Sequence, residues 1–367
     1  MASPLDETVF MRRAIRLSER GRGRVAPNPI VGAVLVRRGQ VVGEGWHRAL
    51  GEPHAEAMAL GRAGNLAKGA TLYCTLEPCD HHGRTPPCTD AVIAAGVERC
   101  VIALRDPNRI VDGRGLHRLR AAGVRCEVGL LADAVRQSAH GYLLAHTERR
   151  PRFTWKVAMT LDGRIADASG HSKWISGPEA RRRGHAMRAA SDAVLVGVGT
   201  IRADDPRLTV RLPKYRGPQP LRVVCDTQLR IPLTSRVVRG PLAAGTVVAC
   251  GRSAPASRER VLRALGVDVW RLPEAGGRVS LRALSRALVA SGRHEVLIEG
   301  GATLGTAWMR ARLVDDLAIF ASPRILGDGL GWCAPFGRSL ASAPKGRLRA
   351  IEQVGDDALL HLTLEAR

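Results

Sequence analysis

The sequence predicts an α/β protein that folds into two domains. Its 367 residues are more than one hydrophobic core usually contains. The composition, with 45% hydrophobic and 25% charged residues, is typical of a chain that buries a core and argues against disorder. In both halves, short apolar segments of strand length alternate with helical segments. This alternation is typical of sheets that have helices packed on their faces, so we expect an α/β architecture throughout.

The elements of the N-terminal half follow from local patterns along the chain. The N-terminal half begins with apolar residues at helical spacing, which predict a helix. The Pro-Asn-Pro segment that follows predicts a turn. Gly39 supplies the backbone freedom for a tight turn between two strands. Pro53 suits the first turn of the next helix, which we expect to begin at His54. In chain order we expect a helix, a turn, two strands, a helix, a strand, a helix and a strand, at 6–20, 27–29, 30–46, 54–61, 70–78, 89–97 and 99–107.

A polar segment that contains a proline separates the two halves. Residues 147–152 read TERRPR, a composition expected of a linker. We therefore expect one domain at 1–146 and a second at 147–367. Residues 331–367 are the least distinctive part of the second domain. Seven apolar segments are expected to form its strands, at 153–159, 192–198, 220–226, 245–250, 267–272, 295–300 and 315–321.

The chain is strongly basic, and this charge restricts its partners. The net charge of +22 comes from 56 basic and 34 acidic residues and is spread along the chain. The densest basic run, at 181–183, lacks interleaved aromatic residues of the kind that stack on single-stranded bases. We therefore expect small phosphorylated ligands, and no nucleic acid, as the partners of these charges.

The ends and the cysteine content indicate the compartment. The N-terminal residues include acidic side chains and lack the apolar core of a signal peptide, and no apolar run of about 18 residues occurs anywhere. We therefore expect a cytoplasmic protein without a membrane partner. Eight cysteines are too few for a disulfide scaffold, so the cluster at 74–88 indicates metal binding or catalysis. The sequence leaves the oligomeric state open, a homo-oligomer included.

A group of His, Glu and Cys residues has the pattern of a zinc-dependent deaminase. The HAE at 54–56 matches the H-x-E motif, and the PC at 78–79 matches the start of the P-C-x-x-C motif. The next cysteine is Cys88, at the start of a predicted helix, where a thiolate is stabilised. On spacing alone, His82 remains a rival to Cys88 as the third ligand. Three ligands leave the fourth coordination position open, which argues against a purely structural zinc module.

Two strand-to-helix turns in the second half are suited to a dinucleotide. The strand at 295–300 runs into Gly300-Gly301 and then into a helix, so backbone N–H groups and a helix N-terminus can face a phosphate. Residues 196–200 form a second such turn, and carboxylate and guanidinium side chains follow it at 203–211. No G-x-G-x-x-G motif follows, which argues against a Rossmann domain.

These motifs resemble those of a known bifunctional family. In the N-terminal half, PNPIVGAVLV, HAE, TLEPCDHHGRTPPC and DPNRIVDGRG are similar to the deaminase half of the pyrimidine deaminase/reductases of riboflavin biosynthesis. In the second half, KVAMTLDGRIA, the stretch from GHSKWISG to DDPRLTVR, and VLIEGGATLG resemble the reductase half of the same family. The resemblance implies a cytidine-deaminase-like domain followed by a dihydrofolate-reductase-like domain.

The resemblance also assigns residues. It implies that zinc binds to three ligands, His54, Cys79 and Cys88, and that Glu56 shuttles the proton. It implies that the pyrimidine substrate of the deaminase is surrounded by Asn28, His81, Arg84, Asp106 and Asn108. NADPH would be contacted by Ala158, Trp174, Thr200, Gly300, Gly301, Ala302, Thr303, Leu304 and Gly305. The substrate of the reductase would meet Lys156, Ser172, Arg188, Asp204, Leu208, Arg211 and Glu299.

The implied activity is a pair of reactions on a phosphorylated pyrimidine. The first is hydrolytic deamination of 2,5-diamino-6-ribosylamino-4(3H)-pyrimidinone 5′-phosphate, and the second is reduction of its ribosyl group to ribityl by NADPH. A different interpretation is a nucleic-acid base deaminase with a basic C-terminal binding domain, against which the long cysteine spacing argues. The chain departs from the family pattern at Arg109 and Asp112, in the loop that follows Asp106.

Overall fold

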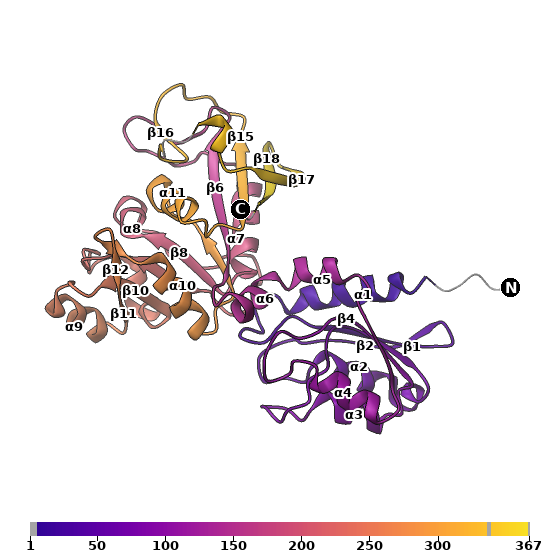
Figure 1. Ribbon diagram of the computed structural model, residues 1–367. Helices are drawn as coiled ribbons and strands as arrows, with labels where there is room; N and C mark the ends of the chain where they lie inside the picture. Colours follow the sequence, from indigo (N-terminus) through magenta and orange to yellow (C-terminus); the bar gives the residue numbers. More distant parts are fainter. Residues whose placement is uncertain (1–5, 336–338, 366–367) are drawn as a thin grey trace. The chain divides into compact units, whose positions relative to one another are not determined.

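The computed structural model describes residues 6–335 and 339–365, which form two compact units with the division after Arg149 (Figure 1). The connection between the units, 148–151, follows a helix and precedes a strand. Within this described part of the chain, none of the helices combines the length and the apolar character that a membrane crossing needs.

The first unit is built on a five-stranded mixed sheet with the strand order β2-β1-β3-β4-β5. β1 pairs antiparallel with β2 and β3, whereas β3, β4 and β5 run parallel. The carboxyl ends of β3 and β4 therefore lie at the same edge of the sheet. The strands are β1 (Gly32–Arg37), β2 (Gln40–Trp46), β3 (Thr71–Leu76), β4 (Arg99–Leu104) and β5 (Arg125–Val128).

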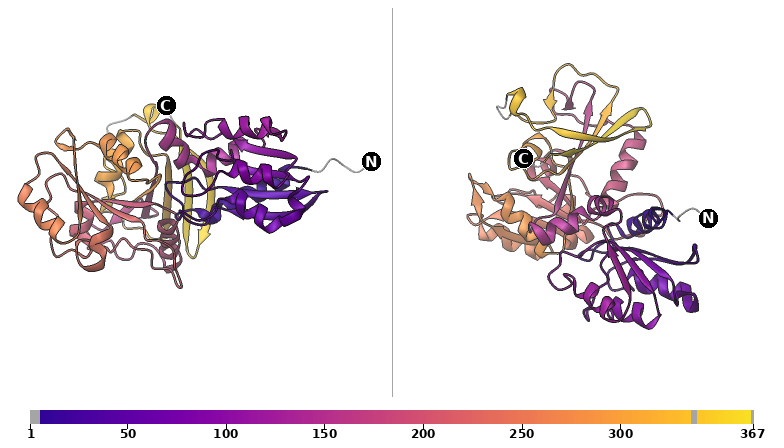
Figure 2. Two further views of the ribbon diagram at one scale, coloured as in Figure 1. Left: turned by 90° about the horizontal axis from the view of Figure 1, so that it is seen from below. Right: turned by 45° about the vertical axis from the view of Figure 1, so that its right-hand side comes forward.

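Helices cover both faces of this sheet (Figures 1 and 2). Apolar residues of α2, α3 and α4 form a core on one face, and those of α1, α5 and α6 form a second core on the other. The α-helices are α1 (Thr8–Ser18), α2 (Ala55–Ala63), α3 (Cys88–Ala94), α4 (Arg114–Ala121), α5 (Ala132–Ser138) and α6 (His140–Thr147), with 3-10 turns at Glu19–Gly21 and Gly64–Ala67.

Local sequence signals predicted most of these elements. The tight turn between β1 and β2 has positive φ at Arg38 (50°) and Gly39 (77°), as a two-residue hairpin turn requires. The predicted start of α2 is wrong by one residue. His54 has an extended backbone (φ −69°, ψ 165°) and is the N-cap residue, so Pro53 lies before the helix and not in its first turn. Helices α4, α5 and α6 and strand β5 were not predicted.

The second unit is built on a nine-stranded sheet with the order β11-β10-β9-β8-β14-β6-β15-β18-β17. The first seven strands in this order are parallel, and β18 and β17 are antiparallel additions at one edge. The strands are β6 (Arg152–Thr160), β8 (Ala193–Gly197), β9 (Leu221–Cys225), β10 (Thr246–Gly251), β11 (Asp268–Leu272), β14 (Glu295–Ile298), β15 (Asp316–Ser322), β17 (Gly346–Val354) and β18 (Asp357–Leu364). Two small pairs are β7 (Arg164–Ala166) with β16 (Leu330–Gly331), and β12 (Glu274–Ala275) with β13 (Arg278–Val279).

All seven predicted apolar segments of this unit contain strands of the sheet. The terminal hairpin β17–β18 was missed, although Gly355, with φ of 67°, marks its turn. β17 is an edge strand, and its pairing with β18 shifts register between Leu348 and Ala350, which is a bulge or irregularity in the edge.

Helices also cover both faces of the second sheet. Residues of α7, α8 and α9 pack on one face, and those of α10 and α11 pack on the other. β8 and β14 are neighbours, and each leads directly into a helix, so the N-termini of α8 and α11 lie at the same edge of the sheet. The helices are α7 (Pro178–Ala189), α8 (Val198–Asp204), α9 (Ala256–Ala264), α10 (Leu281–Ala290) and α11 (Ala302–Arg310), with 3-10 turns at Arg236–Val238, Gly240–Gly245 and Leu340–Ser342.

Candidate functional site

Three side chains of the first unit form a group that could hold a metal ion. His54 caps α2, Cys79 follows β3, and Cys88 is the first residue of α3. His54 Nδ1 lies 3.5 Å from Cys79 Sγ and 3.3 Å from Cys88 Sγ, and all three ligand atoms lie within 4.8 Å of one another. Distances of this size are those between the corners of a tetrahedral site with metal–ligand bonds of about 2.0 to 2.3 Å, so the donor set fits zinc.

The surroundings of the three ligands favour metal binding. Thr85 Oγ1 lies 3.4 Å from His54 Nε2, a contact that leaves Nδ1 free for a metal. Hydrogen bonds from Cys88 and from His54 lower the pKa of the Cys79 thiol, which favours its thiolate form. His82, the rival ligand on spacing alone, is exposed and does not belong to the group.

Glu56 is the buried acid beside this group. It lies in the first turn of α2, two residues after His54, and its side chain interacts with Cys88. Burial, followed by the nearby charge of Cys79, raises the pKa of Glu56 to about 7. A carboxyl group with such a pKa can take up and release a proton near neutral pH, as a general acid and base must.

Two polar side chains next to β1 and β2 are linked to the metal group through the ring of His47. Asn28 Nδ2 lies 3.2 Å from Nε2 of the buried His47, whose ring meets the ring of His54 edge-on with a centroid distance of 5.1 Å. His47 was not predicted, and its only signal in the sequence is its position directly after the strand 40–46. His81, after Cys79, has a buried Nδ1 that lacks a hydrogen-bond partner among the described residues, whereas Arg84 is exposed.

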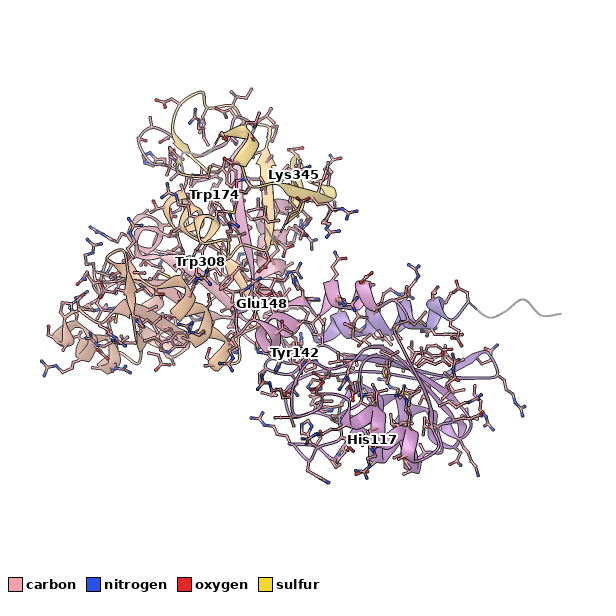
Figure 3. All side chains as sticks on the ribbon, viewed as in Figure 1. His117, Tyr142, Glu148, Trp174, Trp308 and Lys345 are labelled. Atoms are coloured by element: carbon pink, nitrogen blue, oxygen red, sulfur yellow. The ribbon has the colours of Figure 1, made fainter. Side chains whose placement is uncertain are left out.

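The loop after β4 carries Asp106 and Asn108. Tyr142 of α6, labelled in Figure 3, donates a hydrogen bond of 3.0 Å to Asp106, and the backbone N–H of Asn108 donates another of 2.8 Å. Burial raises the pKa of Asp106 to about 6. The side chains of Arg109 and Asp112, where the sequence departs from the family pattern, are both exposed.

The second unit contains a cavity of about 570 Å³ at the edge where α8 and α11 begin. Its walls include all seven residues predicted for the reductase substrate and five of the nine predicted for NADPH: Lys156, Ser172, Arg188, Asp204, Leu208, Arg211, Glu299, Ala158, Trp174, Thr200, Gly300 and Gly301. The remaining four, Ala302, Thr303, Leu304 and Gly305, lie in α11 and do not line the cavity.

Glu299 is the buried charged centre of this cavity. It receives two hydrogen bonds from Arg188, to Oε1 at 2.5 Å and to Oε2 at 2.9 Å, and Lys156 Nζ lies 3.3 Å from Oε2. Burial alone would raise the pKa of Glu299, but the charges and hydrogen bonds of Lys156 and Arg188 outweigh it and hold the pKa below its usual range. Arg188 also donates to the carbonyl oxygen of Thr209 at 3.0 Å, so several of its N–H groups are committed to the protein.

Two further residues of the cavity wall were not singled out from the sequence. His185 accepts a hydrogen bond from the backbone N–H of Arg211 at 3.2 Å. Burial and the neighbouring charges of Arg188 and Arg211 lower the pKa of His185 to about 4, so its imidazole is neutral at physiological pH. Arg236 reaches the same wall and pairs with Asp205 at 3.3 Å.

The turn between β14 and α11 leaves room for a cofactor phosphate. A Cβ atom added to Gly301 would meet only Ile165, at 4.0 Å, so the turn faces open space in the cavity. Gly305 has a different reason to be glycine, because its Cβ would lie 1.9 Å from the ring of Trp155. Trp174, labelled in Figure 3, is 63% exposed, and the Arg181 guanidinium lies 4.4 Å from its ring centre.

We expect that the ion pair of Glu299 stabilises the second unit and that Arg188→Leu lowers the free energy of unfolding by about 3 kcal/mol at neutral pH. The pKa of Glu299 is depressed in the folded state, so its contribution is present above the unfolded value of about 4.5 and is lost as the pH falls towards the folded value. The difference in the free energy of unfolding between the wild type and the variant should therefore become smaller as the pH is lowered. Urea-induced unfolding at several pH values measures it.

Arg182→Leu is the matched control for this prediction. Arg182 lies on the same helix and pairs with Glu179 at 3.2 Å, but its side chain is exposed. Exposed ion pairs contribute little, so this variant should stay within about 0.5 kcal/mol of the wild type. If both variants lost the same free energy of unfolding, burial would not be the reason that the Glu299 pair stabilises the unit.

Known proteins match both units. Residues 5–104 match the family model of the cytidine and deoxycytidylate deaminase zinc-binding region, and residues 151–360 match that of the RibD C-terminal domain. The riboflavin biosynthesis protein RibD of Escherichia coli is 43% identical over 373 residues, which cover 98% of this chain and 99% of that protein. RibD of Aquifex aeolicus is 39% identical and covers 96% of both chains.

Solved structures match along the whole chain as well. A structure of Acinetobacter baumannii RibD (form 1) has a TM-score of 0.90 at 37% identity and covers 98% of this chain and 99% of its own. The Thermotoga maritima diaminohydroxyphosphoribosylaminopyrimidine deaminase/5-amino-6-(5-phosphoribosylamino)uracil reductase has a TM-score of 0.84 at 34% identity, with 97% and 98% covered. These matches confirm the predicted cytidine-deaminase-like and reductase domains, together with zinc and NADPH as their cofactors. The chain belongs to the RibD family, the bifunctional deaminase/reductases of riboflavin biosynthesis.

Proposed function

We propose that the two reactions are carried by separate groups of residues, a deaminase site within 1–146 and a reductase site within 147–367. Two observations carry this proposal: one unit has a metal-binding group beside a buried acid, and the other has a cavity of about 570 Å³ lined by both charged and apolar residues. In the order implied by the chemistry, 2,5-diamino-6-ribosylamino-4(3H)-pyrimidinone 5′-phosphate is deaminated first. The ribosyl group of the product is then reduced to ribityl.

For the deaminase site, we propose that His54, Cys79 and Cys88 hold the zinc. When bound there, zinc lowers the pKa of a coordinated water and so supplies a nucleophile near neutral pH. Glu56 takes a proton from the attacking water and gives a proton to the amino group that leaves as ammonia. Its burial supports this role, because a pKa of about 7 lets the same carboxyl group act in both directions.

Polar side chains around Glu56 are suited to recognise the pyrimidine. Asn28 offers an amide to the edge of the ring, and its contact with His47 orients that amide. His81, with its unpartnered buried nitrogen, and Asp106 and Asn108 on the loop after β4 offer further hydrogen-bonding groups. The exposed Arg84 is free to approach the phosphate of the substrate.

For the reductase site, we propose that the turn at Gly300 and Gly301 and the N-terminus of α11 receive a phosphate of NADPH, which supplies the hydride when bound. Ala158, Thr200 and Trp174 line the same cavity and would contact the rest of the cofactor. The four α11 residues that do not line the cavity would support this turn from behind.

The remaining cavity residues would bind the substrate of the reductase. Arg188 and Lys156 orient the Glu299 carboxylate, which can then accept hydrogen bonds from ribose hydroxyl groups. Arg211 has fewer protein partners than Arg188, so it is better suited to pair with the 5-phosphate. Ser172 and Asp204, whose oxygens lie 3.4 Å apart, and Leu208 complete the wall.

Two assays on the purified protein test this function directly. We expect ammonia release from the diamino pyrimidine nucleotide, with one zinc per chain, and NADPH oxidation when the deaminated intermediate is supplied. Ammonia release from an oligonucleotide, and none from the nucleotide, would instead favour a nucleic-acid base deaminase. We further propose that the enzyme works in the cytoplasm, where a reducing environment keeps its eight cysteines from forming disulfides.

A side chain at Gly301 should block the cofactor. Gly301→Val is expected to raise the KM for NADPH at least about tenfold, because a branched side chain fills the space at the turn that a phosphate would occupy. Gly301→Ala should give a smaller increase in the same direction. Initial rates of NADPH oxidation measure both, and an unchanged KM in the valine variant would mean that the phosphate binds elsewhere.

A further inference from the structure

Glu77 is a buried carboxylate that lies between the end of β3 and the segment after β4. It follows β3, two residues before Cys79, and is only 3% exposed. Its two oxygens accept three backbone hydrogen bonds, from the N–H groups of Asp106 (3.3 Å), Gly113 (3.1 Å) and Leu116 (3.1 Å). All three donors belong to the segment that follows β4, so one side chain directly after β3 holds the backbone of the segment that follows the neighbouring strand.

A single oxygen of Glu77 joins the two ends of a loop. Oε2 accepts from both Asp106 and Gly113, the first and last residues of the loop 106–113. Inside the loop, Asp106 Oδ1 accepts from the N–H of Asn108, and the carbonyl oxygen of Asn108 accepts from Val111 at 2.8 Å. Arg105, directly before the loop, also donates to the carbonyl oxygen of Asp112 at 2.8 Å. The side chains of Asp106 and Asn108 therefore depend for their position on a loop whose ends are joined by Glu77 in the interior and by Arg105 at the surface.

The other oxygen of Glu77 caps α4. Gly113, the N-cap residue, has no side chain to cap the helix, and the first turn of α4 contains no acidic residue. Oε1 of Glu77 instead accepts from Leu116, the third residue of the helix, and so satisfies an N–H group that would otherwise lack a partner. A negative charge at a helix N-terminus is also favourable for the helix dipole.

The first turn of α4 lies directly against the chain that leads to Cys79. A Cβ atom on Gly115 would lie 2.0 Å from the carbonyl oxygen of Pro78, so only glycine permits this approach. The position of α4, of the loop 106–113 and of the residues before Cys79 is thus set by contacts around Glu77.

We propose that Glu77 is a positioning residue of the deaminase, which fixes the loop 106–113 so that Asp106 and Asn108 face a substrate held at the metal group. The inference rests on the substrate roles proposed above for Asp106 and Asn108. It also explains how the loop accommodates the departures at Arg109 and Asp112. The bonds to Glu77 are made by backbone N–H groups and do not involve these two side chains, which are both exposed. Asp112 adds a surface ion pair with Arg105 at 3.1 Å.

Glu77→Gln tests the inference with a change of almost no volume. The amide retains one acceptor oxygen but replaces the other with an NH2 group that faces N–H donors, so at least one set of these bonds is lost. We expect the KM for the diamino pyrimidine nucleotide to rise about tenfold while kcat changes less than about threefold. Zinc content should stay at one per chain, and NADPH-dependent reduction of the intermediate should be unchanged.

Asp192→Asn is the matched control. Asp192 is a buried carboxylate of the second unit that accepts backbone N–H bonds from His294 and Glu295, both at 2.9 Å. The same type of substitution there should lower the thermal unfolding temperature but leave the KM of deamination unchanged. A rise of that KM in the control as well would mean that general destabilisation produces the effect, and it would overturn the inference.

A double-mutant cycle with Asn108→Ala separates positioning from a purely structural role. If Glu77 acts through the loop, Glu77→Gln should raise the KM much less in the Asn108→Ala background than in the wild type. Additive effects would overturn the inference, and so would loss of zinc from Glu77→Gln, because the carboxylate would then support the metal ligands instead.

Two remaining outcomes are also decisive. If Asn108→Ala raises the KM and Glu77→Gln does not, the positioning role is wrong and the proposed substrate contact stands. If Asn108→Ala leaves the KM unchanged, the proposed contact fails and the inference falls with it.

If Glu77→Gln lacks a cooperative unfolding transition, Gly113→Ala replaces it as the test. Gly113 has φ of 84°, a conformation that a side chain disfavours, so this substitution disturbs the same end of the loop. An unchanged KM in that variant would overturn the inference.

Discussion

Glu56→Gln should slow deamination at least about a hundredfold while one zinc stays bound per chain, because proton transfer by a positioned side chain typically contributes that much to the rate. The glutamine keeps the shape of the side chain but cannot carry the proton. Glu56 is buried beside Cys88, and its pKa of about 7 in the folded protein is the property that the substitution removes. Ammonia release from the diamino nucleotide and metal analysis of the same sample measure the two effects.

Glu52→Gln provides the control for this variant. Glu52 precedes the same helix but is exposed, so the substitution should leave the turnover within about twofold of the wild type. NADPH-dependent reduction should be normal in both variants. Wild-type deamination by Glu56→Gln would exclude Glu56 as the proton shuttle.

Cys88→Ala should remove most of the zinc and abolish deamination. Its Sγ atom lies 3.3 Å from His54 Nδ1, so the substitution would remove one of the three protein ligands proposed for the zinc. A site that is left with two ligands binds zinc much more weakly, because each ligand contributes to an affinity that is coupled to folding. Atomic absorption of the purified protein and ammonia release measure the loss.

His82→Ala separates the two candidate ligands that the spacing of the motif allows. His82 is exposed and lies outside the metal-binding group, so its removal should leave the zinc content near one per chain. If His82→Ala lost its zinc and Cys88→Ala kept it, the ligand assignment would be reversed.

Features that depend on short stretches of chain could be predicted from the sequence. The hairpin turn at Gly39, the apolar strands of the second unit and the turn at Gly300-Gly301 each follow from a few neighbouring residues with a distinct backbone or burial requirement. The start of α2 could not be placed correctly by the rule that proline favours the first turn. His54 itself has the extended backbone of the cap, which brings its ring towards Cys79.

Features that depend on tertiary contacts could not be predicted. His47 belongs to no motif, and Glu77 lies within the motif at 75–88 without a role assigned from it. Their roles appear only when the fold brings Asn28 and the loop after β4 beside them. The hairpin β17–β18 was missed because the apolar residues of β17 do not alternate regularly with polar ones, since Ala350 and Ile351 are adjacent at the register shift.

The edge position of β17 has a consequence for the behaviour of the protein at high concentration. Unpaired N–H and C=O groups at the edge of a sheet can template the addition of strands from other molecules, which leads to aggregation. β17 contains Arg347, Arg349 and Glu352, and its register shift beside Arg349 interrupts the regular spacing of the edge. Charged side chains and such irregularities hinder strand addition. The charges and the irregularity of β17 thus counteract strand addition at an edge that also exposes Leu348 and Ile351.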